Sequence, residues 1–142
     1  MMTTLEPKGV SPMRLELDPQ GDGLHLREVR RTVRAWLDAA GLPEVMVEEL
    51  VLAASEACAN VVDHSGARAT VHCPAGWIDG AISDDAVRIV VTDRGRWLHR
   101  PPTSERSTRG RGLQLMRGLV DDMQLVTGAE GTTVELVRRR MA

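Results

Sequence analysis

The sequence predicts an α/β fold: a two-layer sandwich in which helices cover one face of a mixed, mostly antiparallel sheet. Two observations predict it. Apolar residues recur at helical spacing in three segments, whereas five other segments alternate or form short apolar runs. Only one helical segment lies among the last four predicted strands. A parallel sheet needs a crossover helix between neighbouring strands, so this order favours a sheet with its helices on one side.

The N-terminal half begins with residues 1–12, which we expect to be flexible. Apolar and charged residues then alternate over 13–17, which predicts a strand. Two helices follow, over 24–40 and 44–64, because apolar residues recur there at the spacing of one helix face. Gly41 lies between them, and glycine commonly follows the last turn of a helix.

The middle of the chain is predicted to form two strands separated by a loop. Residues 68–74 alternate weakly and predict the first strand. Residues 79–85 hold one Gly and three Asp, which predicts a loop. The run Val-Arg-Ile-Val-Val-Thr at 87–92 predicts the second strand, because β-branched residues favour strands.

The C-terminal part is predicted to begin with a long loop. Residues 94–111 are rich in Arg and show no periodicity, and loops of this length in small domains often act as lids. A helix is predicted over 112–120. Two strands follow, over 123–127 and 132–138, and the glycines of the 128–131 turn predict a hairpin between them.

The charge of the chain is distributed unevenly. Its net charge is −2, but residues 94–142 hold 10 Arg against 5 acidic residues, and residues 1–93 hold 8 basic against 15 acidic residues. Chance explains such an asymmetry about as well as function does. The functional interpretation is that the basic segment, which includes the predicted lid, faces an anion.

Composition also excludes several classes of function. A net charge of −2 gives no basic field for nucleic acid, and three Trp with no Phe or Tyr leave few rings for base stacking. No apolar run approaches the roughly 20 residues that span a bilayer, and no signal sequence begins the chain. Cys58 and Cys73 have neither metal-site nor disulfide-framework spacing. We therefore expect residues 1–142 to form one cytoplasmic domain that contacts neither nucleic acid nor a membrane.

Polar residues share one face of the second predicted helix. Glu56, Asn60 and Asp63 are spaced by four and three residues, which places them side by side. A solvated polar face explains this pattern without any function. The functional interpretation pairs a general base with an amide ligand for Mg²⁺, a cation that prefers oxygen ligands shared with nucleotide phosphates.

Two further motifs follow predicted strands or precede helices. Asp93 and Gly95 come directly after the strand at 87–92, at the kind of sheet edge where α/β proteins bind ligands. Asp93 and Gly95 either form an ordinary turn at the end of the strand, or they bind a purine, with the Asp93 carboxylate accepting a hydrogen bond from its amine. Gly110 and Gly112 precede the third helix, where they serve as a flexible joint or as a phosphate cradle at a helix N-terminus.

The order and spacing of these motifs, together with the strand that starts at Gly131-Thr-Thr, resemble the nucleotide-binding boxes of the Bergerat-fold (GHKL) ATPases. That superfamily includes histidine kinases, gyrase and MutL. Within it, the segment Ser-Glu-Ala-Cys-Ala-Asn-Val-Val-Asp-His-Ser at 55–65 resembles the asparagine box of the small bacterial anti-sigma serine kinases. The resemblance covers about residues 13–138 and implies a histidine-kinase-like ATP-binding domain with ATP and Mg²⁺ as cofactors.

The resemblance also implies roles for individual residues. Asn60 is the counterpart of the Mg²⁺ ligand, and Glu56 of the general base. Asp93 is the counterpart of the residue that recognises the adenine amine, and Gly95 lies beneath the base. Where the family often has a third glycine in this box, the sequence has Trp97.

The remaining counterparts lie in the lid, the last strand and the first helix. The lid box spans residues 110–113 (Gly-Arg-Gly-Leu), so Gly110, Arg111, Gly112 and Leu113, with Arg109, are implied to bind nucleotide. Thr132 or Thr133 is the counterpart of a Thr that supports the adenine through water. Arg30 is the counterpart of an Arg that contacts both the sigma factor and its antagonist in the family.

The function implied is that of an ATP-dependent protein-serine kinase and anti-sigma factor, which binds a sigma factor and phosphorylates a STAS-type antagonist on Ser. A homodimer is common in the family. The alternative is an ATP-binding switch without useful turnover, in a free chain or in a larger signalling protein. A sensor histidine kinase is disfavoured, because 142 residues leave no space for a phospho-accepting helix pair. Gyrase-like and MutL-like enzymes are disfavoured because no transducer domain follows.

Overall fold

The computed structural model describes residues 11–17, 23–65, 76–94, 108–128 and 131–140. Its elements in chain order are β1 (Met13–Leu17), α1 (Gly23–Ala39), α2 (Glu44–Ser65), β2 (Gly76–Ile82), β3 (Ala86–Asp93), α3 (Thr108–Leu119), β4 (Asp122–Gly128) and β5 (Gly131–Arg139). Residues 1–12, expected to be flexible, are described only from residue 11.

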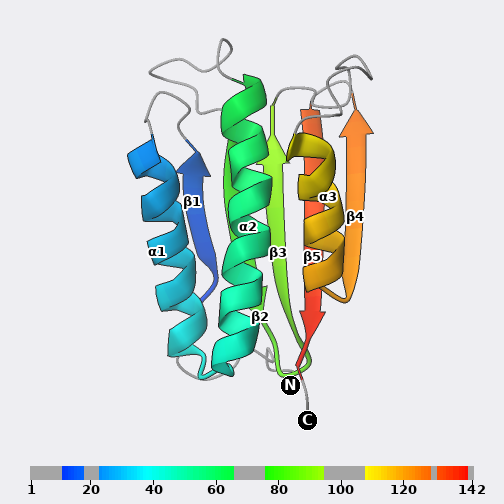
Figure 1. Cartoon of the computed structure of the whole chain (residues 1–142). Coiled ribbons are helices and arrows are strands. Elements are labelled where there is room, and N and C mark those ends of the chain that lie inside the picture. Colours follow the sequence, from blue (N-terminus) through cyan, green and yellow to red (C-terminus); the bar gives the residue numbers. More distant parts are fainter. Residues whose placement is uncertain (1–10, 18–22, 66–75, 95–107, 129–130, 141–142) are drawn as a thin grey trace, which may run out of the picture.

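The strands form one sheet in the order β1-β2-β3-β5-β4, and each of the four described pairs is antiparallel. All three helices cover one face of this sheet (Figure 1). The predicted two-layer sandwich with helices on one face is therefore confirmed. The sheet was predicted to be mostly antiparallel, and every described strand pair is antiparallel.

The core lies between the sheet and the helices. Alternate residues of β3 and β5 point toward the helices and are buried, as a period of two requires. Because the chain has no Phe or Tyr, this core consists of aliphatic, Met and Cys side chains. Its largest fully buried members are Leu17, Leu37, Leu50, Ile78, Ile89, Met116, Leu136, Val29, Val33, Val47, Val61 and Val87.

The predictions for the middle of the chain are partly wrong. The strand expected at 68–74 lies outside the described residues. Strand β2 occupies 76–82, so residues 79–82 of the predicted 79–85 loop belong to a strand. The loop there is only the short turn at 83–85. Gly80 and the three Asp of residues 79–85 predict a loop, but Gly80 lies under the Trp36 ring. A Cβ at Gly80 would come within 2.4 Å of Trp36 Cη2, so the space that a side chain would fill is already occupied.

The third helix begins earlier than the sequence predicts. α3 starts at Thr108 rather than at 112, so four residues of the predicted 94–111 lid belong to the first turn of a helix. Glycine lowers helix propensity, which explains why a segment with two glycines in five residues is read as loop. The packing of α3 against α2 overrides that local preference.

The ends of the elements that carry the predicted site residues gather at one end of the sandwich. β3 and α2 end there, and β5 and α3 begin there, at the top of Figure 1. The tight described connections α1–α2, β2–β3 and α3–β4 lie at the opposite end. None of the described helices is long and apolar enough to cross a membrane.

Candidate functional site

The end of the sheet carries two buried polar residues side by side. Asp93 and Thr132 are register partners on β3 and β5, and their relative exposures are 0% and 1%. They continue the alternating rows that bury Val91 and Val134, so both side chains lie on the helix-covered side. The Thr132 hydroxyl oxygen is buried and has no hydrogen-bond partner within the described residues. A buried hydroxyl of this kind needs a hydrogen-bond partner, which a ligand or a water would supply.

Gly131 allows the chain to turn into β5 against the end of β3. Its φ is +140°, a conformation that residues with a Cβ rarely adopt. A Cβ at this position would lie 2.0 Å from the carbonyl oxygen of Asp93. The close backbone approach sets Thr132 beside the Asp93 carboxylate, and only glycine permits it.

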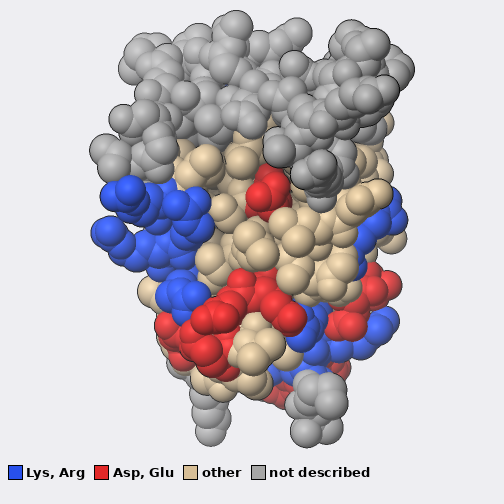
Figure 2. Space-filling model, viewed as in Figure 1, with Lys and Arg blue, Asp and Glu red and all other residues tan. Residues whose placement is uncertain are grey.

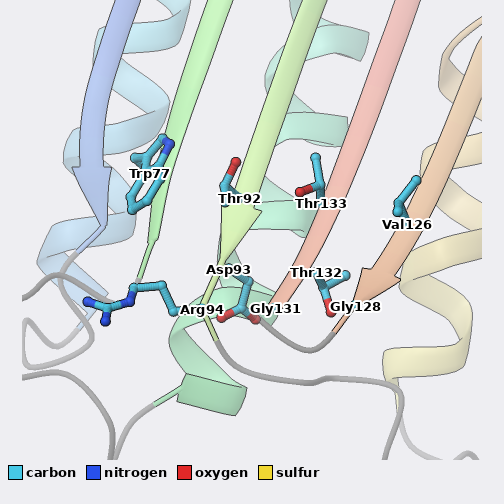
Figure 3. Close-up of a pocket in the computed structure, with 9 residues that line it drawn as sticks. All are labelled: Trp77, Thr92, Asp93, Arg94, Val126, Gly128, Gly131, Thr132 and Thr133. Atoms are coloured by element: carbon cyan, nitrogen blue, oxygen red, sulfur yellow. The ribbon is translucent and has the colours of Figure 1, made fainter.

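A cavity of about 630 Å³ opens beside this pair. Its lining combines the end of the sheet with the face that the helices leave open: Trp77, Thr92, Asp93, Arg94, Val126, Gly128, Gly131, Thr132 and Thr133 (Figure 3). Thr133 is half-buried on the open face, next to Thr92. The structure thus separates the two candidate threonines, because Thr132 shares the helix-covered face with Asp93 and Thr133 does not.

The long helix α2 brings Glu56 and Asn60 to the same end of the molecule. Asn60 is buried, with 6% of its surface exposed, and lies one turn beyond the half-buried Glu56. The Glu56 carboxylate lies against α3: a Cβ built on Gly112 would be 2.9 Å from Glu56 Oε1. Gly112 therefore provides the space that the carboxylate occupies. Of the third predicted member of this face, Asp63, only the backbone is described.

The first turn of α3 contains the predicted phosphate-binding segment. The backbone of Arg109, Gly110 and Arg111 is helical, and the side chains of Arg109 and Arg111 lie outside the described part. The first four N–H groups of a helix have no partner within it and carry partial positive charge, which suits an anion. Leu113 is half-buried and packs against the core. Gly95 lies outside the described residues.

Arg30 lies on α1, and its guanidinium reaches α2. Arg30 Nη1 donates a hydrogen bond of 3.3 Å to Ser55 Oγ, next to Glu56 in the chain. Arg30 is one of several exposed basic residues along α1, the helix that lies under the blue area at the left of Figure 2.

Sequence reasoning missed two groups of residues, one at this site and one at the opposite end of the sandwich. Trp77 and Thr92 line the cavity, and only the β2–β3 register brings them together. Arg138, from the far end of β5, donates to Glu49 Oε1 at 2.6 Å and to the Leu119 carbonyl at 2.9 Å. It thereby ties β5, α2 and the end of α3 together. No local sequence signal marks either group.

Cys58 lies between Glu56 and Asn60 in the chain but belongs to the core. It is fully buried, and burial raises the pKa of its thiol to about 12. The thiol is therefore protonated and unsuited to catalysis or metal binding. Within the part of the chain that is described, no three His, Cys, Asp or Glu side chains converge as a metal site would require. A single amide ligand is still compatible with Mg²⁺, which keeps waters and takes phosphate oxygens.

Comparison with known proteins identifies the family. A family model described as a histidine kinase-like ATPase domain matches residues 20–138. The chain belongs to the histidine kinase-like ATPase family. A solved structure, of the RsbU and RsbW domains of Rv1364c from Mycobacterium tuberculosis, is similar to this histidine kinase-like ATPase domain, with 29% identity and a TM-score of 0.72. The match covers 94% of this chain and 34% of that one, so the chain spans about a third of its length.

These findings confirm the family that the sequence motifs predict. The histidine kinase-like ATPase domain has the α/β architecture expected of a Bergerat-type ATPase. An ATPase domain of this family binds ATP.

Proposed function

We propose that the chain is an ATP-dependent protein-serine kinase and anti-sigma factor, which binds a sigma factor and phosphorylates a STAS-type antagonist on Ser. The observation that carries this proposal is the convergence at one end of the sandwich of Asp93 with Thr132, and of Glu56 with the start of α3. Membership in the histidine kinase-like ATPase family and the likeness to the RsbU and RsbW domains support it.

The buried polar pair suits the adenine end of ATP. The Asp93 carboxylate accepts from an exocyclic amine, and the unpartnered Thr132 hydroxyl accepts from or donates to a water beside it. The close approach at Gly131 leaves this end of the sheet free of side-chain bulk. On this proposal Thr132, rather than Thr133, is the threonine that acts with Asp93, and Gly95 lies beneath the base.

The helix side suits the phosphates and the acceptor. When bound, Mg-ATP supplies the phosphoryl group and the cation that neutralises its oxygens. Asn60 would hold the cation through its amide oxygen, and the N–H groups of the first α3 turn would bind the phosphates. Arg109, Gly110, Arg111, Gly112 and Leu113 form this nucleotide-binding turn. Glu56, half-exposed beside Gly112, accepts the proton of the serine hydroxyl.

Partner binding is assigned to the helix layer. Arg30 is exposed on α1 and is held over α2 by its hydrogen bond to Ser55, so a protein that contacts it also lies near Glu56. We place the protein in the cytoplasm with a sigma factor and a STAS-type antagonist as partners, with no direct contact to nucleic acid, and as a homodimer.

The test combines Mg-ATP, the purified chain and each STAS-domain protein encoded in the same genome, with radiolabelled ATP. We expect transfer to a serine of one such protein by the wild type. A Glu56→Gln variant keeps the shape of the side chain and removes the base, so it should bind ATP normally by calorimetry and transfer nothing. Asp93→Asn should instead weaken ATP binding itself.

Two other results would change the conclusion. The wild type and Glu56→Gln could both bind ATP and a STAS-domain protein and yet transfer no phosphate. That result would favour the regulatory switch over the kinase. An absence of any heat of association with Mg-ATP would refute the whole assignment of the site.

A further inference from the structure

The helix layer exposes two large apolar side chains close to Glu56. Leu52 on α2 is 43% exposed and Leu115 on α3 is 39% exposed. Figure 2 shows uncharged surface over the middle of α2 and α3, between the arginines of α1 and the acidic residues lower on the molecule. Exposed apolar side chains that adjoin a catalytic site are typical of a surface that meets another protein.

Two contacts fix the register between α2 and α3. Glu56 lies against Gly112, and Arg138 bridges Glu49 and the carbonyl of Leu119. Seven residues separate the contacts on each helix, and the helices run in opposite directions.

Leu52 lies four residues before Glu56 on α2. Because the two helices run in opposite directions, the residue of α3 at the same height is four residues after Gly112, which is Met116. Met116 is buried, and its neighbour Leu115 turns outward. Leu52 and Leu115 therefore lie at about the same level on two helices that pack together, and we call the surface that carries them the Leu52–Leu115 patch. Leu52 lies about 6 Å along α2 from Glu56 at 1.5 Å per residue.

The exposed charges on the two sides of this patch differ. On one side, α1 exposes Arg27 and Arg31, one turn apart, for which no ion pair exists among the described residues. Toward the start of α2, Glu44 and Glu48 are exposed. A protein that covers the patch is complementary when its acidic side meets α1 and its basic or neutral side meets the start of α2.

We propose that the Leu52–Leu115 patch is the docking point of the protein that accepts the phosphoryl group. The acceptor inserts an apolar side chain between Leu52 and Leu115, about one helical turn from its serine hydroxyl, and turns acidic side chains toward Arg27 and Arg31. This inference rests on the proposed kinase function and adds the chemistry of the substrate surface: a serine with an apolar neighbour and an acidic flank.

The test is the double variant Leu52→Ser with Leu115→Ser. The matched control is Val45→Ser, an apolar residue that is 66% exposed on α2 but about 16 Å along the helix from Glu56. With the STAS-domain protein that the wild type phosphorylates or binds, we expect the double variant to raise KM and the calorimetric Kd about tenfold, as loss of partial burial of two leucines implies. The kcat, the Kd for Mg-ATP and the Tm should stay within twofold or a degree or two of wild type, and the control should not change any of them.

Other outcomes overturn the docking assignment. An unchanged KM and Kd for the acceptor means that the protein docks elsewhere. A change in Mg-ATP affinity or in sedimentation, with an unchanged acceptor Kd, means that the patch is covered by this chain's own residues or by a second copy. Failure of every STAS-domain protein to bind also refutes it. The kinase proposal fails separately, when Leu52 and Leu115 affect binding but the wild type transfers no phosphate.

Discussion

Replacing Gly112 by Ala should raise the stability of α3 and lower the rate of phosphoryl transfer at the same time. Gly112 is the fifth residue of α3, so it lies in the helix interior, and its φ is not positive. In such a position Ala stabilises a helix by about 0.5–1 kcal/mol relative to Gly. The added methyl group, however, points at the Glu56 carboxylate.

The magnitude follows from one distance. A Cβ on Gly112 would lie 2.9 Å from Glu56 Oε1, whereas ordinary carbon–oxygen contact begins near 3.4 Å, so the carboxylate must move by about half an ångström. The atom in question ends a flexible side chain, so this movement costs little stability. A displacement of about 1 Å at a catalytic group can lower the rate about a hundredfold, and half of it implies a loss of about tenfold.

The assay pairs urea unfolding with a single-turnover measurement of phosphoryl transfer. Gly118→Ala is the matched control: it lies on the same helix, and a Cβ added there would point into open space, with no contact within 4 Å. We expect the control to gain stability without losing rate. The reasoning is refuted if Gly112→Ala transfers phosphate at the wild-type rate while Glu56→Gln is inactive, or if Gly112→Ala destabilises the fold by more than about 1 kcal/mol.

Three further outcomes test the fold and the site. Gly131→Ala should destabilise the protein by about 2 kcal/mol in urea unfolding and weaken ATP binding, because its Cβ strikes the Asp93 carbonyl; a neutral result would contradict the close approach. Arg138→Met should lower the free energy of unfolding by about 2 kcal/mol, since it removes charged hydrogen bonds, whereas Glu49→Gln should lose less. The peptide containing Cys58 should resist alkylation at pH 8 until the protein unfolds, as mass spectrometry would show, because the thiol is buried and protonated; fast labelling of the native protein would show that the helix opens.

Most elements could be predicted from local patterns, because their periodicity is strong. The helices at 24–40 and 44–64 and the strand at 87–92 match α1, α2 and β3 to within a residue at each end. β2 could not be predicted, because two of its seven residues are glycines and glycine is a weak strand former. Its stability comes from both neighbouring strands and from the Trp36 ring over Gly80, which are long-range contacts.

The site also depends partly on local spacing and partly on long-range contacts. Spacing alone places Glu56 and Asn60 on one helix face, and Asp93 at the end of a strand. Spacing does not choose between Thr132 and Thr133, which differ only in the face of the sheet they occupy. The register of β5 against β3 makes that choice, since it pairs Asp93 with Thr132.

The amino-acid sequence by itself determined the types of the elements, the layered architecture and the family, because periodicity and motif spacing are properties of neighbouring residues. Only the tertiary structure decided that Glu56 meets Gly112 and that Leu52 and Leu115 are exposed at a similar level of two packed helices. Those relations depend on how two helices far apart in the chain pack on one sheet, and that packing is the sum of many weak contacts rather than of any local signal.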